Sequence, residues 1–173
     1  MSKIVTVKFD NEPVHVFDST IYIYQNESNK FGLNLEFIIT EIVAKKYHYY
    51  RDKVNVTFEL SNGMIKNYPM SVEDVTEVGN AEIPVIFLHT DIPSIEGFED
   101  VIILDDDTFN EKYPELNKNI SIEEIRKVEM PKEDVDIEVN LPIDLAEWIY
   151  ANEKNMSAIL EEALHDYWKK KSK

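Results

Sequence analysis

The hydrophobic pattern changes abruptly near residues 130–134, and the segment that follows limits most strictly how this chain can fold. Every second residue from 135 to 141 is apolar: Val135, Ile137, Val139 and Leu141. That spacing predicts a short β-strand with one buried face. Because the residues upstream show a different pattern, we place a domain boundary here and treat 1–131 and 132–173 as two domains.

Two amphipathic helices are predicted after this strand. Pro142 suits the first turn of a helix because its missing N–H is not needed there, and this helix is expected to end near Asn152. Ser157 is expected to cap the second helix. The apolar residues of the two helices recur every three to four positions: Leu145, Trp148 and Ile149, then Ile159, Leu160, Ala163, Leu164, Tyr167 and Trp168. One strand and two short helices cannot bury this surface alone, so we expect a second copy of the chain to cover it.

This strand–helix–helix order resembles the ribbon-helix-helix family of dimeric regulators, the type of the MetJ and Arc repressors. The residues that carry the resemblance lie within about 135–171: Leu141, Pro142, Leu145, Trp148, Ile149, Ser157, Glu162, Ala163, Leu164 and Tyr167. The resemblance implies a homodimer in which two strands pair antiparallel between subunits, four helices intertwine, and outward ribbon side chains enter the DNA major groove. The dimer core expected on this basis consists of Val135, Ile137, Val139, Leu141, Leu145, Trp148, Ile149, Leu160, Leu164 and Trp168.

The charges on the predicted ribbon disfavour DNA as its partner. The outward positions are Asp136, Glu138 and Asn140, where the family usually carries cationic, hydroxyl or amide side chains. Residues 132–173 hold ten acidic and six basic side chains, and the whole chain has a formal net charge of −16. DNA phosphates would be repelled by this charge. We therefore expect the ribbon to serve dimerisation or protein contact, with a DNA-binding regulator, an antitoxin and an acidic DNA-mimic inhibitor as alternatives.

Residues 1–131 are predicted to form a mainly antiparallel β domain with short helices, which places the chain in the α+β class. The clearest element is a hairpin of strands 54–60 and 64–68, joined by Ser61-Asn62-Gly63. Further strands are expected at 4–9, 14–17, 20–24, 85–88 and 101–104, and helices are expected to begin at 71–74 and 121–124. The stretch 33–50 fits helical spacing, but its β-branched and aromatic residues favour a strand.

One stretch interleaves cations with aromatic rings. Its candidate ligand-binding residues are Lys45, Lys46, Tyr47, Tyr49, Arg51 and Lys53. Cations beside tyrosine rings can hold single-stranded nucleic acid or a phosphorylated ligand. On a strand, however, Tyr47 and Tyr49 would share one face, so some of these rings would belong to the core. An ordinary strand and turn is therefore the alternative interpretation.

An acidic stretch, Asp105, Asp106 and Asp107, follows a predicted buried strand. Neighbouring carboxylates can hold a divalent cation, but this stretch lacks the alternating ligands and the glycine of a calcium loop. We expect a solvated acidic loop that could dock a basic partner, and no metal site.

The sequence contains no motif that indicates catalysis. It has no cysteine, only four glycines, and four histidines that lie far apart. No nucleophile elbow, phosphate loop or dinucleotide fingerprint occurs. No apolar run approaches the length of a membrane span. We therefore expect a cytoplasmic, non-enzymatic regulatory or interaction protein without a cofactor, which binds a protein partner as a dimer; a basic partner would suit its charge.

Overall fold

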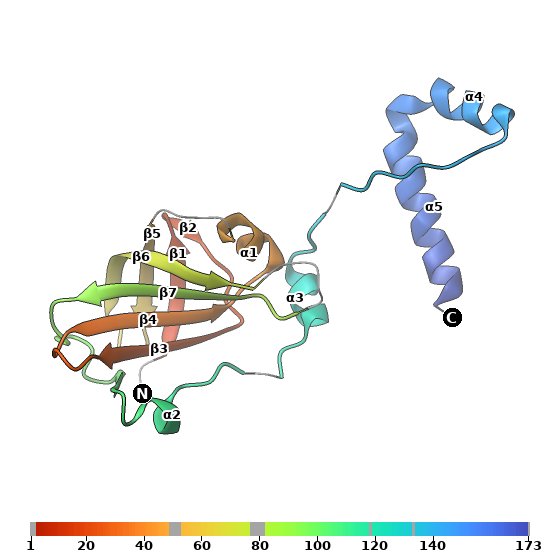
Figure 1. Ribbon diagram of the computed structural model, residues 1–173. Coiled ribbons are helices and arrows are strands. Elements are labelled where there is room, and N and C mark those ends of the chain that lie inside the picture. The colour runs from red at the N-terminus through yellow and green to blue at the C-terminus, as the bar shows by residue number, and fades with distance from the viewer. Residues whose placement is uncertain (1–2, 49–52, 77–81, 118, 133, 173) are drawn as a thin grey trace. The chain divides into compact units, whose positions relative to one another are not determined.

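The computed structural model describes residues 3–48, 53–76, 82–117, 119–132 and 134–172. The chain divides into two compact units, Met1–Lys132 and Glu133–Lys173. Both are shown in Figure 1.

The N-terminal unit is built on one sheet, in which eight strands are found among the described residues in the order β2-β1-β5-β6-β7-β4-β3-β8. The strands are β1 (Ile4–Phe9), β2 (Glu12–Pro13), β3 (Asp18–Gln25), β4 (Phe31–Ile38), β5 (Val54–Leu60), β6 (Ile65–Val75), β7 (Val85–Ile92) and β8 (Ile102–Leu104). All neighbours pair antiparallel except β8, which runs parallel to β3. The predicted α+β class with a mainly antiparallel sheet is confirmed.

The sheet bends at strand β6, which connects the two halves that enclose the core. The first half of this strand pairs with β5 as far as Met70, whereas its second half pairs with β7 from Ser71 onward. An irregular register between Val72 and Asp74 accompanies this change of partner. The two halves of the sheet consequently lie one in front of the other (Figure 1). Their facing side chains form a single apolar core, which includes Phe9, Ile23, Leu35, Phe37, Val56, Phe58, Ile86 and Leu88.

Two hairpins show how local sequence fixes the strand register. The predicted β5–β6 hairpin is confirmed, with Glu59 opposite Ile65, and Gly63 has the positive φ of 82° that such a turn requires. A second hairpin joins β1 to β2 through Asp10 and Asn11, whose φ angles are 49° and 70°. Both residue types tolerate this left-handed conformation, and it matches the twist of the strands.

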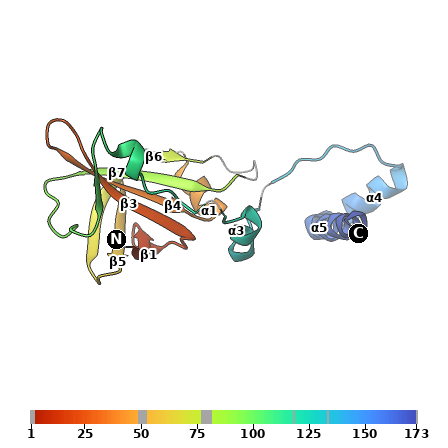
Figure 2. The same ribbon diagram turned by 90° about the horizontal axis from the view of Figure 1, so that it is seen from below.

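Three α-helices lie in the described part of the N-terminal unit: α1 (Glu41–Tyr47), α2 (Phe109–Lys112) and α3 (Ile122–Val128). The helix start predicted at 121–124 is confirmed, because Ser121 and Glu124 form a capping box at α3. The Arg126 guanidinium of α3 binds both carboxylate oxygens of Glu41 at 2.7 and 2.8 Å. Figure 2 shows α3 beside α1, and this ion pair joins them.

Three sequence predictions in this unit are wrong. The stretch 33–50 is not one strand, because β4 ends at Ile38 and Thr40 then caps α1 with its side chain. Residues 71–74 extend β6 rather than begin a helix, since pairing with β7 overrides the local capping pattern. Residues 14–17 form no strand; Val14 and Phe17 donate single backbone hydrogen bonds to β1 and β4.

The C-terminal unit contains α4 (Ile143–Ala151), a 3-10 turn η1 (Glu153–Asn155) and α5 (Met156–Lys171). Both predicted helices are present, but Ser157 lies inside α5 and Asn155 occupies the N-cap position. The predicted strand at 135–141 is not formed in the single chain. A strand needs a hydrogen-bonded neighbour, and the described residues of this unit contain no other strand to supply one.

Candidate functional site

Most of the large apolar side chains of the C-terminal unit are exposed. None of the described residues from 134 to 172 is buried. Nine of the ten predicted dimer-core residues are exposed, by fractions from 41% to 73%: Val135, Ile137, Val139, Leu141, Leu145, Trp148, Leu160, Leu164 and Trp168. The tenth, Ile149, is half-buried. Exposed apolar side chains in such number are typical of an interaction surface.

The outward ribbon positions are exposed as well. Asp136, Glu138 and Asn140 lie in the same irregular segment as the alternating apolar residues. The single chain therefore exposes both faces of this segment and does not separate an inner face from an outer one. Such a separation would require a second strand alongside it.

The two helices of this unit have few stabilising contacts of their own. Neither α4 nor α5 has a side-chain hydrogen bond at its N-cap. The Asn152 amide donates to the Trp148 carbonyl oxygen at 2.8 Å, which ties the end of α4. Lys169, Lys170 and Lys171 occupy the last turn of α5, where positive charge is favoured by the helix dipole. These contacts are local, so they leave the apolar surface uncovered.

The structure describes four of the six residues of the predicted basic and aromatic patch. Lys45 and Lys46 lie in the last turn of α1, and Lys53 is exposed just before β5. Tyr47 is only 2% exposed and packs edge-on against Phe9 with ring centres 5.4 Å apart. The ring of Tyr47 therefore belongs to the core, as the alternative interpretation held for some of these rings. Tyr49 and Arg51 lie outside the described residues.

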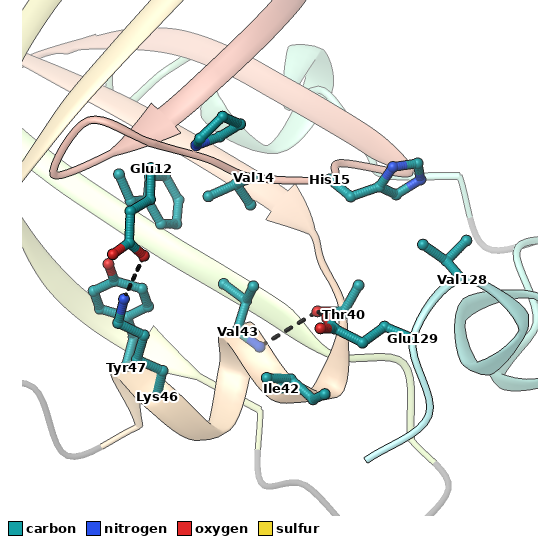
Figure 3. Close-up of a pocket in the computed structure, with 12 residues that line it drawn as sticks. Glu12, Val14, His15, Thr40, Ile42, Val43, Lys46, Tyr47, Val128 and Glu129 are labelled. Atoms are coloured by element: carbon teal, nitrogen blue, oxygen red, sulfur yellow. Dashed lines mark hydrogen bonds and ion pairs between the residues drawn. The ribbon is translucent and has the colours of Figure 1, made fainter.

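A pocket of about 530 Å³ lies between α1 and the segment that follows β1 (Figure 3). Lys46 and Glu12 form an ion pair of 2.8 Å across its rim. The Thr40 hydroxyl accepts a hydrogen bond from the Val43 amide and donates one of 2.8 Å to Glu129. The charged and hydroxyl groups that these contacts involve are thus engaged with one another.

Two of the three aspartates predicted as an acidic patch, Asp105 and Asp106, accept hydrogen bonds from different side chains. Asp105 accepts hydrogen bonds from the Thr108 hydroxyl and amide at 2.7 and 2.9 Å, and these bonds lower the pKa of the Asp105 carboxyl. Asp106 accepts from the Tyr24 hydroxyl, and Asp107 is exposed. Among the residues that the structure describes, no group of three His, Cys, Asp or Glu side chains could hold a metal ion.

Sequence reasoning missed a cluster of tyrosines on the outer face of β3. Tyr22 packs against Tyr113 with ring centres 5.3 Å apart, and the Tyr113 hydroxyl donates to Glu36 on β4. Burial, reinforced by the charge of Glu36, raises the pKa of Tyr22 to about 12. The signal in the sequence was the spacing of two between Tyr22 and Tyr24, which places both rings on one face of the strand.

Searches for similar proteins found no matching protein family, no matching curated protein and no matching solved structure. Within the described ranges, no helix is both long and apolar enough to cross a membrane.

Proposed function

We propose that this protein is a non-enzymatic, dimeric interaction protein whose C-terminal unit is completed by a second copy of the same chain. The observation that carries the proposal is the exposure of nearly every apolar side chain of that unit, among them Trp148 and Trp168. A unit of this size rarely folds stably without disulfides, a metal or association, and the chain has no cysteine. Association is the route its surface supports.

The second copy suits this surface better than an unrelated partner does. Segment 135–141 has the alternating pattern of a strand but forms none in the single chain, and two identical segments can pair antiparallel about a two-fold axis. Pairing about its middle residue, Glu138, would set Val135 opposite Leu141 and Ile137 opposite Val139. All apolar side chains of both segments then fall on one face, which α4 and α5 of the two chains can cover.

Charge supports a basic protein as the target of the dimer. Two copies carry twice the formal charge of −16, and the ribbon would add Asp136 and Glu138 from each chain on its outer face. Such a surface accelerates encounter with a basic partner and opposes nucleic acid. Two symmetric copies also add avidity when the partner offers two sites.

The experiment is sedimentation velocity of the full chain and of a chain that ends at Lys132. We expect the full chain to sediment as a dimer, with twice the 20.2 kDa mass of one chain, and the shortened chain to sediment as a folded monomer. Leu164→Glu, at an exposed position, serves as the matched variant that should dissociate the dimer without unfolding either chain's N-terminal unit. A monomeric full chain at micromolar concentration would contradict the proposal.

The resemblance of the predicted strand–helix–helix order to the ribbon-helix-helix family also suggests a second candidate, a DNA-binding regulator or antitoxin. A gel-shift assay at low salt against the promoter region of the protein's own gene distinguishes it. A shift that is weakened or altered in sequence preference by Asp136→Asn and Glu138→Gln would support DNA reading by the ribbon. If the protein instead captures DNA-binding proteins from a cell lysate, and salt releases them, the protein acts as a DNA mimic.

A further inference from the structure

A second cavity, of about 400 Å³, lies on the outer face of the sheet beside α2. Its floor is a row of side chains across three strands, because Tyr22 of β3 is opposite Asn34 of β4, and Asn34 is opposite His89 of β7. Tyr24 and Phe109 line it from β3 and α2. Volumes of this order are typical of sites for small molecules.

The aromatic rings of the cavity form a corner rather than a slot. Phe109 meets Tyr22 at a ring distance of 6.3 Å and an angle of 73°, and meets Tyr24 at 6.1 Å and 85°. Perpendicular rings cannot sandwich a flat base between parallel faces. They suit a rounded group that contacts several rings at once, as substituted ammonium groups do in aromatic cages.

The charges at this corner select for a cation. Asp106 lines the cavity and accepts the hydroxyl hydrogen bond of Tyr24. That bond enriches the electron density of the Tyr24 ring and, as the largest cause, raises the pKa of its phenol. Asp105 and Glu27 add negative charge near the same ring, and no Lys or Arg is among the described residues that line the cavity.

The floor of the cavity is fixed before any ligand arrives. Asn34 is 5% exposed, and its amide donates to the Gly32 carbonyl oxygen at 3.1 Å while its oxygen bonds His89 Nδ1 at 2.9 Å. The His89 ring lies so close over Gly32 that a Cβ there would come within 2.6 Å of it. A glycine in a strand often marks such a close approach. Preorganisation of this kind favours binding.

We infer that this cavity binds an organic cation, a substituted ammonium or a guanidinium group, at the corner formed by Tyr22, Tyr24 and Phe109 beside Asp106. The inference is independent of dimerisation. If the cavity binds no cation, the sedimentation result is unchanged. If the full chain is monomeric, cation binding is likewise unchanged.

The test titrates the full-length protein at low salt with choline, with its neutral isostere 3,3-dimethylbutanol, and with N-acetylarginine amide, followed by the NMR shifts of Tyr24, Asn34 and Phe109. We expect saturable shifts with millimolar choline or arginine amide, and binding of the neutral isostere at least about tenfold weaker. Tighter binding of choline would indicate a free quaternary ammonium ligand. Tighter binding of the arginine derivative would indicate a side chain of a protein partner.

Variants localise the binding. Phe109→Leu removes one ring and should weaken binding about tenfold, and Asp106→Asn should weaken it several-fold. Phe109→Leu can also detach the short helix α2, so Tyr24→Phe is the second variant. Tyr24→Phe keeps the ring and removes the hydrogen bond to Asp106. It should weaken binding, but by less than Phe109→Leu does. Tyr150→Leu, in the C-terminal unit, is the control that should leave affinity unchanged. No saturable shift with either cation, equal binding of the neutral isostere, or affinity insensitive to both Phe109→Leu and Tyr24→Phe would overturn the inference.

Discussion

The two units of this chain place their apolar residues in opposite environments. In the N-terminal unit, alternate residues of the strands, such as Val56 and Phe58 of β5, are fully buried in a core shared by both halves of the sheet. In the C-terminal unit, residues with the same alternation, Val135 and Ile137, are more than half exposed. A period of two identifies a strand face that has to be covered, but it does not say whether the same chain covers it.

Helix α3 of the N-terminal unit begins differently from the two helices of the C-terminal unit. The N-terminal helix α3 has a complete capping box at Ser121, and its Ile125 is fully buried. The C-terminal helices α4 and α5 have no side-chain cap and no buried residue. Local and tertiary contacts therefore stabilise α3 within one chain, whereas in our proposal a second chain provides such contacts for α4 and α5.

The largest contrast is expected from large-to-small substitutions in the two units. Phe37→Ala, at a fully buried position beside Phe9, should lower the free energy of unfolding of the N-terminal unit by about 3–5 kcal/mol. Leu164→Ala should leave that free energy unchanged and weaken dimerisation instead. Urea unfolding followed by tyrosine circular dichroism reports mainly the N-terminal unit, and tryptophan fluorescence reports the C-terminal unit, because Trp148 and Trp168 are the chain's two tryptophans. If the tyrosine signal shows that both substitutions lower the free energy of unfolding equally, the proposed difference between the two units is wrong.

A smaller contrast is expected at the helix caps. Ser121→Ala removes the acceptor for the Glu124 amide and should cost about 1 kcal/mol of N-terminal stability. Asn155→Ala, at the N-cap of α5, removes no side-chain hydrogen bond and should change stability by much less. Thermal unfolding of the two variants checks this difference. If Asn155→Ala lowers stability more than Ser121→Ala does, the Asn155 side chain caps α5 in the assembled protein.

The smallest effect concerns the pH dependence of N-terminal stability. Burial raises the pKa of Glu36 above its ordinary value of 4.5, despite the hydrogen bond donated by Tyr113. The native state therefore holds the proton more tightly than the unfolded chain. The stabilisation by protonated Glu36 is complete below pH 4.5 and is lost as pH rises through the raised pKa. Glu36→Gln keeps the acceptor for Tyr113 and should gain stability relative to the wild type as pH rises from 4 to 7.

Urea unfolding at several pH values measures this difference. The matched control is Glu73→Gln, which makes the same chemical change at an exposed position of β6. A stability difference between Glu36→Gln and the wild type that is constant across the pH range would contradict the assignment of Glu36 as a destabilised, half-buried carboxylate.

The sequence predicted best where local chemistry and tertiary pairing agree. The Asn62-Gly63 turn and the Ser121 box are local devices, and both elements form as expected. It failed at 71–74, where a capping pattern lies opposite β7, and at 41–47, where Thr40 ends a β-rich stretch and starts a helix. The cavity beside α2 could not be predicted, because Tyr22, Asn34 and His89 come together only through the strand register.

The most direct test of the central claim, that a second copy completes the C-terminal unit, is self-crosslinking at the middle of segment 135–141. The chain has no cysteine, so Glu138→Cys introduces the only thiol. Antiparallel pairing about residue 138 would bring the two thiols within the Cα spacing that a disulfide accepts. We predict rapid, near-complete oxidation to a covalent dimer, while Glu73→Cys on the exposed side of β6 stays monomeric under the same conditions. If Glu138→Cys crosslinks no faster than Glu73→Cys, the two segments do not pair and the account is wrong.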